Sequence, residues 1–207
     1  MLEQLSLAWQ ATSQLEIVSV GFGLAYVILA ARENQWCWPC AFIGTGTAVV
    51  LFWQGLLRME SLLNAYYLVM AVYGWWQWRG GSNPSAERLS ITSWPVAKHC
   101  LWFISVITLS LLTGALLSVY TDSALPYLDS FTTWGAIITT WMVTQKILEN
   151  WLYWLLINSV SIYLYIEREF YLYAALFAVY LIIAVYGYFQ WRLHFNKRLS
   201  HGHAGYA

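Results

Sequence analysis

A chain of 207 residues that is 60% hydrophobic and only 10% charged has too few polar side chains to cover a water-soluble domain, since such domains carry about 25% charged residues. The formal net charge is zero, so the basic footprint of a nucleic-acid-binding protein is missing. Aromatic residues make up 18% of the chain, and Trp and Tyr gather where membrane proteins meet lipid headgroups. Composition therefore predicts an all-α membrane protein.

Seven mostly apolar segments follow one another along the chain, as expected for helices of the length that crosses a bilayer. We expect these helices over residues 15–31, 36–53, 62–78, 96–120, 131–143, 151–166 and 171–191. The fifth is the weakest, because it is short and rich in Thr. Two polar stretches, 79–95 and 120–130, are predicted loops because they hold Pro, Asn, Asp and Ser. Pro39 is expected to kink the second helix.

Lys and Arg fall unevenly between the two sides that these seven crossings define. Eight of the ten lie on the side that holds the C-terminus, and only Arg58 and Arg168 lie on the other. Cytoplasmic loops of membrane proteins carry an excess of Lys and Arg. We therefore expect a cytoplasmic C-terminus and an external N-terminus, which requires an odd number of crossings.

The third and seventh predicted helices end alike, which indicates an internal repeat. Residues 71–79 (AVYGWWQWR) match residues 184–192 (AVYGYFQWR) at seven of nine positions, 113 residues apart. A second match pairs Trp38 with Trp154, which are 116 residues apart. The difference of three residues from the first spacing predicts a three-residue insertion in the first half. Two three-helix halves would be antiparallel by themselves, and the fourth helix makes them parallel about an axis along the membrane normal.

This repeat predicts the organisation of the chain. The first repeat with its polar loop covers 1–95, the linker helix with an outer loop 96–130, the second repeat 131–194, and a cytoplasmic tail 195–207. Transporters built on such repeats bind their substrate near the interface between the halves. A membrane subunit that only packs against partners is a further reading, but it needs no repeated halves.

Amide and indole side chains form a stripe along the sixth predicted helix. Trp151, Trp154 and Asn158 share one face because they are three and four residues apart, and Asn150 lies beside them. An amide inside hydrocarbon is costly unless it is paired. Facing the bundle, the stripe suits a flat, polar, aromatic ligand. Alternatively, Asn158 joins helices and Trp151 anchors the membrane interface.

The third predicted helix carries a second candidate face with Asn64 and Tyr67. The matching positions of the seventh helix are Phe177 and Tyr180. Positions that differ between the halves can build an asymmetric pocket for an asymmetric ligand. The candidate ligand contacts are therefore Trp38, Asn64, Tyr67, Asn150, Trp151, Trp154, Asn158 and Tyr180.

Four residues are candidates for a gate. Lys146 and Glu149 lie three apart at the cytoplasmic end of the fifth predicted helix. They either pair on the helix surface, worth tenths of a kcal/mol, or gate the inner mouth. Tyr73 and Tyr186 are the other two candidates, from the repeated segments.

Cysteine and histidine usage argues against an enzyme. Cys37 and Cys40 form a C-x-x-C motif, so a membrane thiol oxidoreductase is an alternative. Such an enzyme needs a second relay pair, and only Cys100 remains. Three of the four His lie outside the apolar segments, and His99 precedes the apolar run of the fourth. We expect no catalytic residue, no metal and no cofactor.

Residues 145–154, QKILENWLYW, resemble the K-x-x-E-N-W-x-x-W signature of the PnuC-type vitamin transporters. The segment 125–133, LPYLDSFTT, and the Tyr-Gly pairs at Tyr73 and Tyr186 are similar too. The resemblance covers essentially the whole chain. It implies a 3+1+3 fold related to the SWEET sugar transporters, a bacterial inner membrane and a homotrimer.

The resemblance also implies facilitated transport of an unphosphorylated vitamin, which a cytoplasmic kinase then traps. Nicotinamide-riboside members usually carry Gln where Asn64 stands and Arg where Gln145 stands. The run 64–67 (NAYY) is more similar to the thiamine-transporting subgroup, often called PnuT. The expected ligand is therefore thiamine, with nicotinamide riboside as the alternative. Both are flat, cationic heterocycles that suit aromatic faces.

Overall fold

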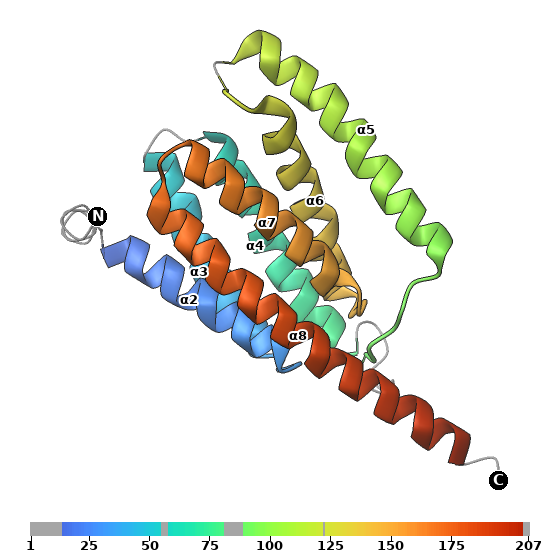
Figure 1. Cartoon of the computed structure of the whole chain (residues 1–207). Coiled ribbons are helices and arrows are strands. Elements are labelled where there is room, and N and C mark those ends of the chain that lie inside the picture. Colours follow the sequence, from blue (N-terminus) through green and yellow to red (C-terminus); the bar gives the residue numbers. More distant parts are fainter. Residues whose placement is uncertain (1–13, 55–57, 81–88, 122, 205–207) are drawn as a thin grey trace.

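The computed structural model describes residues 14–54, 58–80, 89–121 and 123–204, and these confirm the predicted seven helices. The helices are α2 (Gln14–Ala31), α3 (Cys37–Gln54), α4 (Arg58–Trp78), α5 (Val96–Tyr120), α6 (Pro126–Thr144), α7 (Asn150–Glu167) and α8 (Tyr171–Ala204) (Figure 1). Within the described ranges, four of them, α2, α3, α5 and α8, are long and apolar enough to cross a membrane by themselves. The other three helices, α4, α6 and α7, pack against neighbouring helices of the bundle.

Two predicted boundaries and one predicted kink need correction. The helix α6 begins at Pro126, inside the predicted outer loop, because proline suits the first turn of a helix and Asp129 adds an acidic residue there. Pro39 also falls in a first turn, that of α3, where its missing N–H costs no helical hydrogen bond, so no kink is required. The predicted tail from residue 195 is helical through Ala204, and α8 projects beyond the bundle (Figure 1).

Six of the helices form a closed ring. Neighbours in sequence pack together within α2–α4 and within α6–α8, and the ring closes where α4 meets α6 and where α8 meets α2. Exchanging α2–α4 with α6–α8, helix for helix, leaves this pattern of helix contacts unchanged. The helix α5 lies outside the ring against α6 (Figure 1), and its Trp102 stacks on Tyr153 of α7 with ring centroids 4.1 Å apart.

Equivalent tryptophan pairs occur in both halves. Trp38 meets Trp78 edge-on, with centroids 5.3 Å apart at 88°, and Trp151 meets Trp191 at 5.5 Å and 87°. Both pairs follow a spacing of 113 residues, so Trp38 corresponds to Trp151 and not to Trp154. The predicted three-residue insertion is therefore wrong. The repeat in sequence gains support from these contacts.

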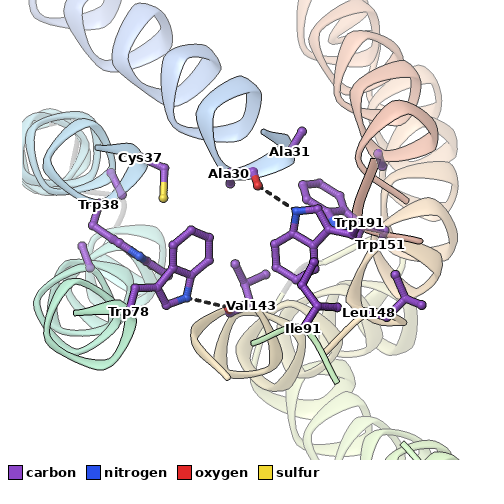
Figure 2. Packing of buried hydrophobic residues seen from close by; sticks show 13 residues of the cluster. Ala30, Ala31, Cys37, Trp38, Trp78, Ile91, Val143, Leu148, Trp151 and Trp191 are labelled. Carbon is purple, nitrogen blue, oxygen red and sulfur yellow. Dashed lines mark hydrogen bonds between the residues drawn. The ribbon is translucent and has the colours of Figure 1, made fainter. Parts of the chain in front are cut away.

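Two hydrogen bonds join the halves at the same register. The Trp78 indole Nε1 donates to the Val143 carbonyl oxygen at 3.2 Å, and the Trp191 Nε1 donates to the Ala30 oxygen at 3.0 Å (Figure 2). Each indole thus reaches from the third helix of one half to the first helix of the other. These four residues belong to the buried cluster that fills this end of the ring.

The bundle has two ends, the Lys146 end and the Arg168 end. The Lys146 end holds the turns after α2 and α6, and the Arg168 end holds the turn between α7 and α8. At the Lys146 end, the segment before α5 is tied down because Thr92 exchanges backbone hydrogen bonds with the connection from α6 to α7. Its N–H donates to the Lys146 oxygen at 3.0 Å, and its oxygen accepts from the Leu148 N–H at 2.8 Å.

Candidate ligand-binding site

Asn158 lies midway along α7 with only 4% of its surface exposed. Within the part of the chain that the structure describes, its amide makes no hydrogen bond, yet it is not one of the fully enclosed polar atoms. The preceding residue, Ile157, packs so closely on α6 that a Cβ at Gly135 would lie 3.2 Å away. Burying an unpaired amide in an apolar setting costs about 2–7 kcal/mol. Asn158 is therefore placed to bond a polar group from outside the chain.

Trp154 lies one turn before Asn158 on the same face of α7, as predicted. It is half-buried and packs against both hydrophobic clusters of the protein, the one between the halves and the one beneath α5. A half-buried indole in that position keeps part of its ring free for stacking beside the amide.

Three other predicted contacts are packed more tightly. Trp38 and Trp151 are 2% and 3% exposed, and each indole N–H is enclosed without a hydrogen-bond partner. Asn150 is fully buried at the first residue of α7, where its Nδ2 donates to the Ile147 oxygen at 2.6 Å. These contacts favour packing roles, and direct ligand contact by the three stays a prediction.

Tyrosines from four helices lie near one another inside the ring. The Tyr67 hydroxyl is within electrostatic reach of Tyr26 on α2 and Tyr165 on α7, and Tyr180 on α8 is within reach of Tyr165. A Cβ at Gly23 of α2 would lie 3.3 Å from the Tyr180 hydroxyl. The tyrosines thus follow one another around the ring, and all four are half-buried.

The sequence-based prediction of ligand contacts included Tyr67 and Tyr180 but not Tyr26 and Tyr165, and ligand contact by any of the four stays a prediction. No stripe on a single helix could have indicated Tyr26 and Tyr165, because the four tyrosines lie on four different helices. Asn64, a further predicted contact, is half-buried and donates from Nδ2 to the Glu60 oxygen at 2.9 Å.

Phe177 stands in the second half where Asn64 stands in the first. Its ring packs on Tyr165 at 5.1 Å and on Tyr180 at 5.6 Å between centroids. One half therefore offers a continuous aromatic surface where the other offers an amide. Such a difference suits a ligand with one aromatic and one polar end.

The predicted surface pair between Lys146 and Glu149 is wrong. The Lys146 Nζ lies 2.6 Å from Glu33 Oε1, whereas Glu149 accepts hydrogen bonds from the Ser93 hydroxyl and, at 3.2 Å, from the Trp94 N–H. The reason is local, because α6 ends at Thr144 and Lys146 adopts a left-handed turn with φ 52°. Burial lowers the pKa of the Lys146 ammonium, while the Glu33 carboxylate opposes that shift.

The two tyrosine gate candidates differ in surroundings. The Tyr73 hydroxyl accepts from Gln145 Nε2 at 3.0 Å, and Gln77 Nε2 donates to Gln145 Oε1 at 3.4 Å, so Tyr73 joins α4 to the end of α6. Tyr186 is 42% exposed. The repeat thus places the same residue in two different environments, and a gating role for either stays a prediction.

The C-x-x-C motif sits at the start of α3. Cys37 is buried, Cys40 is half-buried and Cys100 is exposed, and all three thiols are free. Among the residues that the structure describes, no cluster of three or more His, Cys, Asp or Glu side chains could hold a metal ion.

Replacing Cys37 by Ala together with Cys40 by Ser is expected to leave ligand binding and transport within about twofold of the parent, since such small changes alter little volume. Uptake into proteoliposomes measures this. Loss of uptake in a monodisperse, folded double variant would show that the two thiols take part in transport.

The seven helices of the described residues, six of them in a ring built from two halves, give the architecture of a multi-pass membrane protein. A family model described as "Nicotinamide mononucleotide transporter" matches residues 13–193. The chain therefore belongs to this family of PnuC-type vitamin transporters, which are carriers of the bacterial inner membrane and not enzymes.

Curated relatives span nearly the same length. The nicotinamide riboside transporter PnuC of Escherichia coli (strain K12) is 24% identical over 217 aligned residues, covering 91% of each chain. The nicotinamide riboside transporter PnuC of Haemophilus influenzae is 26% identical over 86% of this chain and 79% of its own. The riboflavin/roseoflavin transporter RibM of Streptomyces davaonensis is 25% identical over 83% of this chain and 81% of its own.

A solved structure has the same fold. The crystal structure of the vitamin B3 transporter PnuC superimposes with a TM-score of 0.73, covering 95% of this chain and 88% of that one at 20% identity. The predicted fold class, a helical membrane transporter of the PnuC type, is confirmed.

Proposed function

We propose that this protein carries a flat, unphosphorylated vitamin with a cationic ring across the inner membrane, with nicotinamide riboside as the first candidate. The observation that carries the proposal is the buried Asn158 amide, which no described residue satisfies. The two relatives named as nicotinamide riboside transporters support that ligand ahead of thiamine.

Binding follows from the chemistry of the interior. Trp154, Tyr67 and Tyr180 offer ring faces to the cationic heterocycle, worth about 0.5–2 kcal/mol for each contact. The Asn158 amide bonds the polar edge of the ligand. Among the described residues, Asp and Glu occur only near helix ends or in turns. A site without a buried counter-charge releases its cation readily, which suits a facilitator.

Thiamine is the second candidate. It is supported by Asn64 and Gln145, where the chain departs from the usual nicotinamide-riboside pattern. Gln145 is held by Tyr73 and Gln77, so its amide is fixed at the Lys146 end and not in the middle of the bundle. Any influence of Gln145 on ligand choice would act during passage through that end.

The proposal also covers the orientation, the internal repeat, the assembly and the metabolic partner of the transporter. The excess of Lys and Arg supports a Lys146 end in the cytoplasm, with the N-terminus outside. The paired contacts at a spacing of 113 residues support two parallel three-helix halves joined by α5. We further propose a homotrimer and a cytoplasmic kinase that traps the vitamin by phosphorylation.

The purified protein is titrated separately with nicotinamide riboside, thiamine and riboflavin. Nicotinamide riboside is expected to give a saturable heat of binding and saturable quenching of Trp fluorescence. Calorimetry measures the affinity, and quenching reports a ligand stacked near Trp154. Binding of thiamine alone would favour the second candidate. Binding of riboflavin alone, or of none of the three by a folded sample, would contradict the cationic-vitamin proposal.

A further inference from the structure

Glu33 and Lys146 occupy equivalent turns in the two halves. They stand 113 residues apart, Glu33 after α2 and Lys146 after α6, and both adopt left-handed backbone conformations, with φ of 57° and 52°. The two turns therefore have the same shape but carry opposite charges. Because the halves face each other, the charges meet, with Nζ and Oε1 only 2.6 Å apart.

The surroundings make this ion pair an enclosed one. The Lys146 side chain is 6% exposed and the Glu33 side chain 23% exposed. The ammonium also lies 4.5 Å from the centroid of the Trp78 ring. The second Glu33 oxygen is 3.0 Å from His194 Nδ1 on α8, so Glu33 binds two elements of the opposite half. An enclosed charge pair is costly to separate, because each ion would need a new partner.

The opposite end of the bundle has a different arrangement. Arg168 lies 2.6 Å from Asp129, but both belong to the second half, at the turn after α7 and the first turn of α6. At the Lys146 end, by contrast, Glu33 of the first half contacts both Lys146 and His194 of the second half.

We infer that the Glu33–Lys146 pair is a clasp that holds the Lys146 end closed and must separate before the ligand leaves by that end. The inference rests on the proposed function, since it concerns passage of the ligand beyond Asn158. Neither residue belongs to the interior tyrosine group or to the face of α7 that carries Asn158. The clasp therefore controls which end is open, while the ligand contacts control affinity.

Cys37 is a built-in reporter for this opening. It is fully buried at the start of α3, in the cluster that also holds Trp78 (Figure 2), the ring beside the Lys146 ammonium. In a background with Cys40→Ser and Cys100→Ser, a membrane-permeant maleimide reports only the accessibility of Cys37.

Lys146→Gln is expected to raise the rate of Cys37 labelling about tenfold without any ligand present, because the closed state loses its buried ion pair between the halves. Electrostatics alone would act the other way, since removing a nearby cation disfavours the reactive thiolate. Arg168→Gln is the matched control, because it breaks an ion pair of equal length at the other end and should leave labelling unchanged.

A second variant separates opening of the clasp from misfolding caused by an unpaired buried charge. Lys146→Met combined with Glu33→Gln leaves no unpaired buried charge and should also raise Cys37 labelling about tenfold. Unchanged labelling in both clasp variants, or an equal rise in Arg168→Gln, would overturn the clasp. Because labelling needs no ligand, this result is separate from a failed ligand titration.

Discussion

Asn158→Ala is expected to weaken binding of the transported vitamin at least about tenfold, which corresponds to about 1.4 kcal/mol. The amide is 4% exposed and has no hydrogen-bond partner among the described residues, so the folded protein loses no internal bond when it is removed. The ligand, by contrast, loses a bond that water cannot replace in a closed interior. Trp154→Ala should have an effect of similar size through the loss of stacking.

Ser159→Ala is the matched control for Asn158→Ala. Ser159 is the next residue, is exposed, and uses its hydroxyl on the Leu155 oxygen of its own helix at 2.8 Å. Its removal should leave affinity unchanged. Calorimetric titration of detergent-purified variants measures all three affinities. If Asn158→Ala and Trp154→Ala fold and bind like the parent, the site lies elsewhere.

Gly74→Ala and Gly187→Ala are each expected to destabilise the protein by roughly 1–3 kcal/mol through overpacking. A Cβ on Gly74 would overlap the Trp38 ring, and a Cβ on Gly187 would lie 2.8 Å from the Trp151 ring. Both rings are enclosed and have no room to retreat. Helix propensity works in the opposite direction, because Ala favours a helix over Gly by about 1 kcal/mol. Packing must therefore account for any loss.

Gly21→Ala gives the matching control, since a Cβ there would meet nothing within 4 Å. It should leave the melting temperature unchanged or raise it slightly. Thermal unfolding in one detergent compares the three variants. Equal melting temperatures for all three would show that the two tryptophan contacts are looser than the structure indicates.

The sequence by itself determined the class of protein and most of its helices. Low charge and seven apolar segments required a membrane, because no other solvent accepts so much apolar surface. The repeated segments 71–79 and 184–192 indicated two related halves, and the face shared by Trp154 and Asn158 followed from helical periodicity alone. These features are local, so they can be read from spacing along the chain.

Partners across the ring depended on the tertiary structure. Lys146 pairs with Glu33 instead of the nearby Glu149, because a left-handed turn ends α6 and directs the side chain to the other half. Tyr26 and Tyr165 lie near Tyr67 only because their separate helices pack into one ring. Contacts between residues more than 100 positions apart are set by how helices pack, and periodicity within one helix contains no information about the face that meets it.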